Sequence, residues 1–229
     1  LDNLRGLNHN PTLLDGRYNQ EEPMLALHIK NHHRTAVCVH HFYKALLCYL
    51  FGDYQQAEQE AQACQQDLSS IGATYTSGWI HFIAALTQLA LIPSSSVLQH
   101  PSRFRKVKSL LNKLQHWAKH CPINQQHRIL LVQAEIARVQ KRYHSAMELF
   151  EQAIVSANQS EVPMDRALAY ELAARLYHNW HKPVIAETYL RSALKLYRQW
   201  GASAKVDHLI QQHQLQEPEN QPLTAQQTP

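Results

Sequence analysis

The sequence predicts an all-α protein of about nine or ten helices that pack as repeated pairs. Glycine is scarce, with 6 residues in 229, and no run of alternating β-branched residues is present, which favours helices over strands. Apolar residues recur at helical spacing through most of residues 21–213. Three stretches within this range share one internal pattern, and such self-similarity is typical of a helical-repeat domain.

The two ends of the chain differ from this central part. Residues 1–20 hold turn signals at Gly6, Pro11 and Gly16 and no clear period, so we expect an irregular segment before the helical domain at 21–213. Residues 214–229 are rich in Gln and Pro and almost free of apolar residues, so we expect a disordered tail. The chain begins at Leu1 rather than Met, and we expect it to be a piece of a longer polypeptide.

The repeated pattern is a helix with a small residue near its middle, a short turn, and an aromatic residue or proline three residues before an alanine. Its three copies are Ala45, Gly52-Asp53, Tyr54 and Ala57; Ala134, Lys141-Arg142, Tyr143 and Ala146; and Ala173, His181-Lys182, Pro183 and Ala186. Small residues let two antiparallel helices approach to about 8–10 Å. Pro183 is expected to start a helix, because the N–H that proline lacks is unpaired at that position in any case.

Between the first and second copies we expect another helix pair, at residues 79–92 and 102–120, with a longer Pro/Ser connection at 93–102. The first of these two runs is the longest apolar stretch of the chain, but polar residues interrupt it. It is also shorter than the roughly 20 residues that a membrane span requires. We therefore predict a core helix there and no membrane span.

Sequence motifs of catalysis and nucleotide binding are absent. The chain has no Gly-x4-Gly-Lys-Ser/Thr loop, no kinase catalytic loop and no Gly-x-Ser-x-Gly elbow, so we expect no enzyme activity in this segment and no cofactor. Four cysteines without a Cys-x-x-Cys pair and the lack of a signal peptide indicate a reduced, cytoplasmic compartment. The net charge of +4 is too mild to indicate nucleic-acid binding by the whole domain.

Two groups of residues raise the question of a small-ligand or metal site. His116, His120 and Cys121 offer two imidazoles and a thiol within one helical turn, but a solvated helix face is the favoured interpretation and no metal is expected. Four tyrosines recur at helical spacing beside alanines, which favours core packing over a ligand cage. They are Tyr170, Tyr177, Tyr189 and Tyr197.

The run at 102–120 carries six basic residues and no acidic one. Its apolar stripe, which includes Phe104, Leu111 and Trp117, would bury one side and leave a basic strip outside. A plain solvated face is the favoured interpretation, followed by docking of an acidic protein surface and then by nucleic acid. The residues of this basic strip that we assign as protein-binding candidates are Arg103, Arg105, Lys106, Lys108 and Lys113.

Several residues fall at the spacing of the tetratricopeptide repeat: Tyr170, Ala173, Ala174, Tyr177, Ala186, Leu190 and Ala193. The chain thus resembles a degenerate, right-handed tetratricopeptide-like solenoid. In such a solenoid the first helix of each pair lines a concave groove that can hold an internal segment of a neighbouring domain. The resemblance places eight residues there: Arg128, Leu131, Glu135, Arg138, Leu168, Glu171, Arg175 and His178. Ordinary intrahelical ion pairs, Glu135 with Arg138 and Glu171 with Arg175, are the favoured alternative.

Longer phrases, among them "CYLFGDYQQA" and "RQWGASAKVDHL", look similar to the helical region of large multidomain bacterial signalling kinases. In that family a serine/threonine kinase domain and an ATPase module precede the helical repeats, and sensor and histidine kinase domains often follow. The resemblance implies a non-catalytic protein–protein interaction and signal-relay scaffold, with the adjoining domains or a peptide segment as partner. The alternative is a ligand-sensing helical regulatory module of an ATP-dependent transcription regulator, which would act through DNA.

Overall fold

The computed structural model describes residues 2–16, 19–72, 75–93, 100–160 and 162–215. Ten α-helices and one short 3-10 helix form in these ranges, which contain no strand. The α-helices are α1 (Glu21–Lys30), α2 (Arg34–Leu50), α3 (Tyr54–Gln66), α4 (Tyr75–Ala90), α5 (Pro101–Ala118), α6 (Pro122–Val139), α7 (Tyr143–Gln159), α8 (Pro163–Asn179), α9 (Pro183–Trp200) and α10 (Ser203–His213). The all-α prediction is confirmed. Of the tail expected to be disordered, residues 216–229 lie outside the described ranges.

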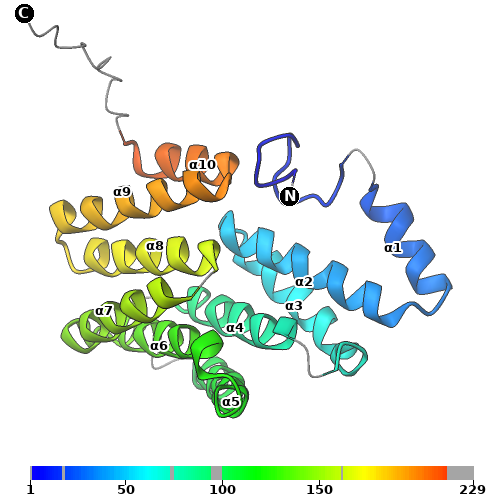
Figure 1. Ribbon diagram of the computed structural model, residues 1–229, viewed down its shortest axis with the longest axis horizontal. Coiled ribbons are helices and arrows are strands. Elements are labelled where there is room, and N and C mark those ends of the chain that lie inside the picture. The colour runs from blue at the N-terminus through cyan, green and yellow to red at the C-terminus, as the bar shows by residue number, and fades with distance from the viewer. Residues whose placement is uncertain (1, 17–18, 73–74, 94–99, 161, 216–229) are drawn as a thin grey trace, which may run out of the picture.

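Helices that follow one another in the chain pack together as pairs: α2 with α3, α4 with α5, α6 with α7, and α8 with α9 (Figure 1). The first helices of these pairs also contact one another in the order α2, α4, α6 and α8. The pairs therefore stack side by side. This arrangement is consistent with a helical-repeat fold.

Several of the turns between helices contain a residue with a positive φ. In the turn before α7, Lys141 adopts a φ of 58°, and the N–H groups of Lys141 and Arg142 donate to the carbonyls of Arg138 and Ala137, both at 2.9 Å. These bonds satisfy carbonyls at the end of α6 that have no partner within the helix. Positive φ values also occur at His32, Gly52, His181 and Gly201, in the turns before α2, α3, α9 and α10. The predicted turns at 52–53, 141–142 and 181–182 are confirmed.

The alanines of the repeat pattern are buried. Ala134 of α6, Ala146 of α7 and Ala173 of α8 have no exposed surface, and Ala186 of α9 is 8% exposed. Burial of these small side chains is what close packing within each pair requires. Pro183 is the first residue of α9, as predicted.

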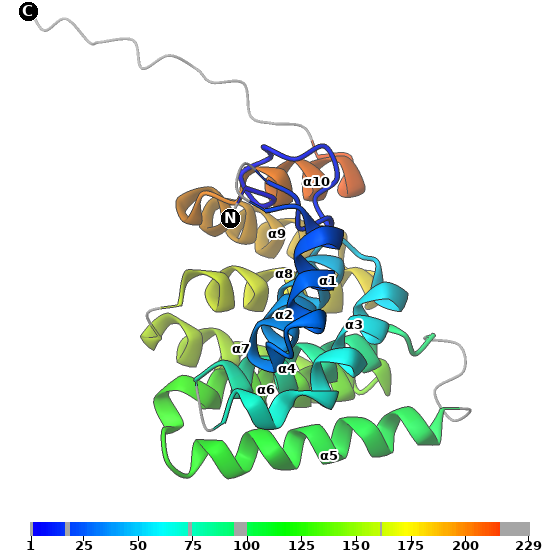
Figure 2. The same ribbon diagram turned by 90° about the vertical axis from the view of Figure 1, so that its right-hand side faces the viewer.

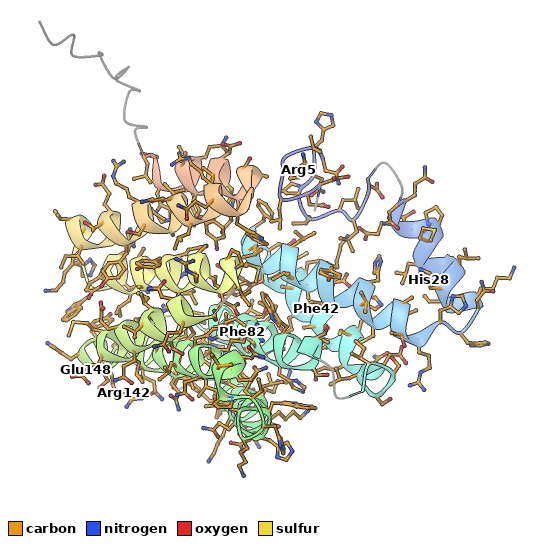
Figure 3. All side chains as sticks on the ribbon, in the orientation of Figure 1. Arg5, His28, Phe42, Phe82, Arg142 and Glu148 are labelled. Carbon is orange, nitrogen blue, oxygen red and sulfur yellow. The ribbon has the colours of Figure 1, made fainter. Side chains whose placement is uncertain are left out.

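Helix α4 forms much of the core. Ile80, Phe82, Ile83, Leu86 and Leu89 are all buried, which confirms the expected core helix. Figure 3 shows the labelled Phe82 inside the stack, whereas the labelled Arg142 and Glu148 project from its surface. Nowhere in the described ranges is a helix both long and apolar enough to span a membrane.

The two ends of the helical stack meet. In the first turn of α10, the N–H of Ala204 donates to the carbonyl of Leu4 at 2.9 Å, and the ammonium of Lys205 donates to the carbonyl of Leu50, the last residue of α2. Figures 1 and 2 both show the N-terminal segment beside α10. The stack therefore curls until its last helix reaches its first pair.

Candidate functional site

The residues predicted to line a concave groove lie mostly inside the molecule. Six of the eight are buried: Arg128, Leu131, Glu135, Arg138, Leu168 and Glu171. Arg175 is partly buried, and only His178 is exposed. A peptide cannot reach the buried side chains in this arrangement unless the helices first separate. Binding of a partner at these eight residues stays a prediction.

One part of this buried set is an ionic cluster on α6 and α8. The guanidinium of Arg138 donates two hydrogen bonds to Glu135, at 2.7 and 2.8 Å, so the expected intrahelical pair is present. Arg175 lies 4.0 Å from Glu135 and donates to the hydroxyl of Tyr54 at 3.2 Å. Arg175 thereby connects α8 with the start of α3, 121 residues earlier in the chain.

The sequence suggested an ion pair between Glu171 and Arg175, but the hydrogen bonds of Glu171 are to other residues. It accepts hydrogen bonds from the ammonium of Lys205 at 2.9 Å and from the hydroxyl of Tyr197 at 2.7 Å. Burial opposes ionisation of Glu171, but the cations of Lys205 and Arg175 outweigh it and lower the pKa of this carboxyl. Burial lowers the pKa of Lys205, and Glu171 partly offsets that shift. These charges hold helices together inside the fold.

Arg128 belongs to a second buried cluster, between α6 and α8. The carboxylate of Asp165 interacts with Nε2 of His127 at 2.7 Å and accepts from Nε and Nη2 of Arg128 at 3.0 and 2.9 Å. The guanidinium also lies 4.4 Å from the ring centre of Trp79 on α4, a distance typical of a cation–π contact. His127 and Asp165 were not among the residues predicted from the sequence. The one available signal was an acidic residue in the first turn of a predominantly apolar helix.

The basic strip on α5 is different, because much of it faces solvent. Helix α5 runs along one edge of the molecule with no helix beyond it (Figure 2). Arg103 is the least exposed member of the strip and donates to Glu58 of α3 at 3.0 and 3.1 Å. Lys106 lies 3.6 Å from the same carboxylate. Burial alone would raise the pKa of Glu58, but the hydrogen bonds that it accepts from Gln88 and Arg103 outweigh burial and lower this pKa.

The other cations of α5, and Lys119 directly after it, are exposed and have no ion pair within the described residues; those on the helix are Arg105, Lys108 and Lys113. At about 100° per residue they fall, with Lys106, in an arc of roughly 160° that is opposite the buried side of the helix. That side presents Val107, Leu110 and Leu114 to the core. Helix α5 and the residue after it thus carry exposed cations along about 20 Å of one face.

The groups considered as metal or ligand sites have local partners instead. The rings of His116 and His120 lie 5.7 Å apart, while the thiol of Cys121 accepts a hydrogen bond from Asn124 at 2.9 Å. Within the described ranges, no three His, Cys, Asp or Glu side chains come close enough to hold a metal ion. Tyr177 stacks on Tyr189 at 5.1 Å, in line with the packing role expected for these tyrosines.

No protein-family model, curated protein sequence or solved structure matches the chain. Its function must therefore be inferred from the surfaces of the molecule itself. Of the two predicted docking regions, only the basic strip presents several charged groups that no other residue of the described chain neutralises.

Proposed function

We propose that this chain is a non-catalytic docking and relay module, which binds an acidic surface of a neighbouring domain through the outer face of α5. The observation that carries the proposal is the row of exposed cations without an ion pair among the described residues: Arg105, Lys108 and Lys113 on a helix without a carboxylate, and Lys119 directly after it. We further propose that the fold is a right-handed tetratricopeptide-like solenoid and that the chain is part of a cytoplasmic, multidomain bacterial signalling kinase with an ATPase module.

The chemistry of the face fits a protein partner. The apolar side of α5 is already used in the core, so the contact would be mainly electrostatic. Such a contact forms quickly and weakens with salt, which suits a relay that engages and releases its partner. The net charge of the whole chain is only +4, and a nucleic-acid-binding domain would normally carry a larger excess.

Charge reversal on the strip tests this function. The domains that flank residues 1–229 in the full-length polypeptide would be titrated against this chain and against Lys108→Glu/Lys113→Glu. We expect the affinity of the variant to fall by about tenfold or more at low ionic strength. Lys30→Glu/Lys195→Glu has the same charge change at exposed positions on α1 and α9 and should bind as the parent does. Equal affinity of all three proteins would disprove docking at α5.

The alternative, a ligand-sensing regulatory module that acts through DNA, makes a different forecast for the same face. Binding to phosphates would give retention on double-stranded DNA that falls steeply as the salt concentration rises. Salt-sensitive retention that Lys108→Glu/Lys113→Glu abolishes, without any binding of the flanking domains, would favour this alternative.

A further inference from the structure

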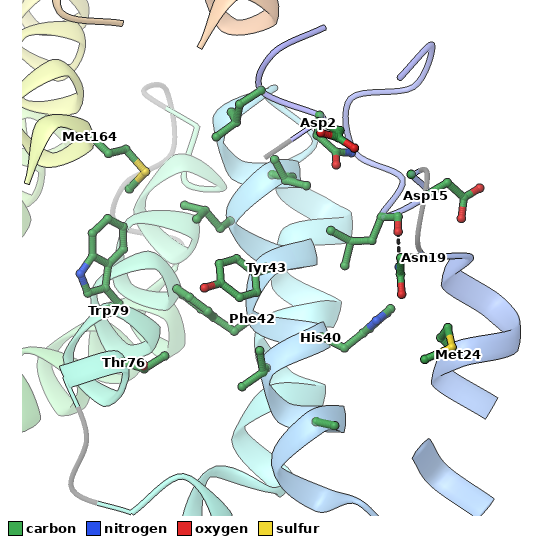
Figure 4. Close-up of a pocket in the computed structure, with 18 of the residues that line it drawn as sticks. Asp2, Asp15, Asn19, Met24, His40, Phe42, Tyr43, Thr76, Trp79 and Met164 are labelled. Carbon is green, nitrogen blue, oxygen red and sulfur yellow. Dashed lines mark hydrogen bonds between the residues drawn. The ribbon is translucent and has the colours of Figure 1, made fainter. Parts of the chain in front are cut away.

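A cavity of about 1000 Å³ opens beside α2, away from the basic strip (Figure 4). Its walls come from the N-terminal segment, α1, α2, the N-terminal parts of α4 and α8, and Trp200 at the end of α9. This volume is at the upper end of the range seen for sites that hold small organic molecules. Neither the docking face nor the buried ionic cluster of Glu135, Glu171 and Lys205 contributes to its lining.

One end of the cavity is aromatic and apolar. Phe42 of α2 and Trp79 of α4 meet edge to face, with ring centres 6.5 Å apart, and Met164 of α8 extends toward Trp79 (Figure 4). The Arg128 guanidinium lies against Trp79, and Asp165 binds this guanidinium from α8. Trp79 is therefore held in place, so the apolar wall exists before any ligand binds.

The other end of the cavity is polar and bears negative charge. Its lining includes Asp2 and Asp15 but no lysine or arginine among the described residues. Oδ1 of Asp15 accepts a hydrogen bond from the N–H of Glu21 at 2.7 Å, which leaves Oδ2 of Asp15 and the carboxylate of Asp2 for a ligand. His40 of α2 and Met24 of α1 point toward each other in this part of the cavity (Figure 4). Burial lowers the pKa of His40, so its imidazole is neutral at neutral pH.

The N-terminal wall is fixed by several contacts. The amide of Asn3, which is 5% exposed, donates to the carbonyl of Pro11 at 3.1 Å. Glu21 accepts from the N–H of Leu14 and pairs with Lys44 of α2. Together with the bond from Ala204 to Leu4, these contacts attach the segment to both α2 and α10. The polar end of the cavity is thus a built part of the fold.

We propose that this cavity binds a small molecule that has an apolar, partly aromatic body and one positively charged amine. The aromatic end accepts the body, and the amine lies near Asp2 and Asp15. The described lining holds no lysine or arginine to neutralise these aspartates. The site should therefore attract an ammonium group and repel a carboxylate or phosphate, and select by charge as well as by shape. This inference does not depend on docking at α5, and either can fail without the other.

Two fluorescent probes with the same apolar group test the charge selection. Dansylcadaverine ends in an ammonium group, and the dansyl amide of 6-aminohexanoic acid, which has a chain of similar length, ends in a carboxylate. We expect saturable fluorescence enhancement with dansylcadaverine and an affinity about tenfold weaker, or no binding, for the carboxylate probe. No saturable binding of dansylcadaverine, or equal affinity for the two probes, overturns the proposal.

Variants show whether the probe binds in this cavity. Asp2→Asn/Asp15→Asn keeps side-chain size and should bring the two affinities within about threefold of each other. The matched control, Glu148→Gln/Asp207→Asn, changes charge equally at exposed positions and should leave the preference as it was. Ala36→Trp places a large side chain in the cavity and should abolish binding of both probes, with folding checked by circular dichroism. A charge preference that survives Asp2→Asn/Asp15→Asn, or binding that survives a folded Ala36→Trp, contradicts the assignment.

Discussion

Four histidine side chains share one response to burial. His81 of α4 is 4% exposed, with Nδ1 2.5 Å from the carbonyl of Ser77 and Nε2 buried without a hydrogen bond among the described residues. Burial lowers the pKa of His81, and it also lowers the pKa of His40, His208 and His213. Each of these rings is therefore harder to protonate in the folded protein than in the unfolded chain.

These histidines make stability depend on pH on the acidic side of neutrality. An unfolded histidine titrates near pH 6.5. Between that pH and the lower pKa of the folded protein, the unfolded chain binds more protons than the folded one. Lowering the pH in this range therefore reduces the free energy of unfolding. We expect the free energy of unfolding, measured with urea, to fall as the pH drops from about 7 to about 5. His81→Gln should reduce this slope, whereas His9→Gln at an exposed position serves as the control; an unchanged slope in His81→Gln would argue against the mechanism.

At the scale of helices and turns, the left-handed residue before α3, α7 and α9 is the common feature. Gly52 adopts this conformation without strain, but Lys141 and His181 have side chains and still have a φ of 58°. Left-handed geometry costs a residue with a Cβ about 1 kcal/mol. The backbone is therefore strained at Lys141 and His181, and a glycine at either position would relieve this strain.

Glycine at these turns should stabilise the protein. We expect Lys141→Gly and His181→Gly each to raise the free energy of unfolding by about 0.5–1 kcal/mol, since relief of strain exceeds the added freedom of the unfolded chain. Gly52→Ala is the reverse experiment: its Cβ would meet no atom within 4 Å, so a loss of about 1 kcal/mol would come from backbone strain alone. A stabilising Gly52→Ala would contradict this account.

The buried alanines provide a second test at this scale. Ala146→Arg and Ala186→Arg should each overpack a helix pair and bury a charge, at a cost of about 1–3 kcal/mol for overpacking and more for the charge. Gln159→Arg, at an exposed position at the end of α7, should be nearly silent. Thermal unfolding followed by circular dichroism compares the three, and parent-like melting of both alanine variants would contradict the repeat packing.

Local patterns were enough to predict these elements, but not their long-range partners. The turn at Lys141-Arg142 and the helix start at Pro183 follow from neighbouring residues, because helix caps and turns are local interactions. The contact of His127 with Asp165 joins side chains 38 residues apart, and no local periodicity identifies such a pair. Short-range patterning likewise showed which face of α8 carries Glu171, but not what covers it.

Closure of the stack is the main feature of the whole molecule. Tyr54 of the first pair contacts Arg175, and Lys205 of α10 joins Glu171 to the end of α2. A helix face that carries Glu and Arg is expected to be exposed, unless another part of the chain packs on it. Here the contacts that cover the face of α8 join residues more than 100 positions apart in the sequence. This is why the groove residues could be placed on the correct helices but not recognised as buried, and why the cavity formed by the N-terminal segment was not foreseen.

The pair of Glu171 and Lys205 allows this closure to be measured. Lys205→Met leaves a buried carboxylate without its main cation, and Glu171→Gln leaves a buried ammonium without its anion, so each should cost about 3–5 kcal/mol in urea unfolding. The double variant removes both charges and should cost much less than the sum of the two. The control is the exposed pair of Arg191 and Glu187, whose charged atoms lie 2.6 Å apart. A double-mutant cycle of Arg191→Met and Glu187→Gln should give a coupling energy of only about 0.3–0.5 kcal/mol. Additive effects at Glu171 and Lys205 would mean that their contact does not hold α10 against the first pair. A strong coupling would instead mean that this contact has to break before α10 can separate from α8 and the end of α2.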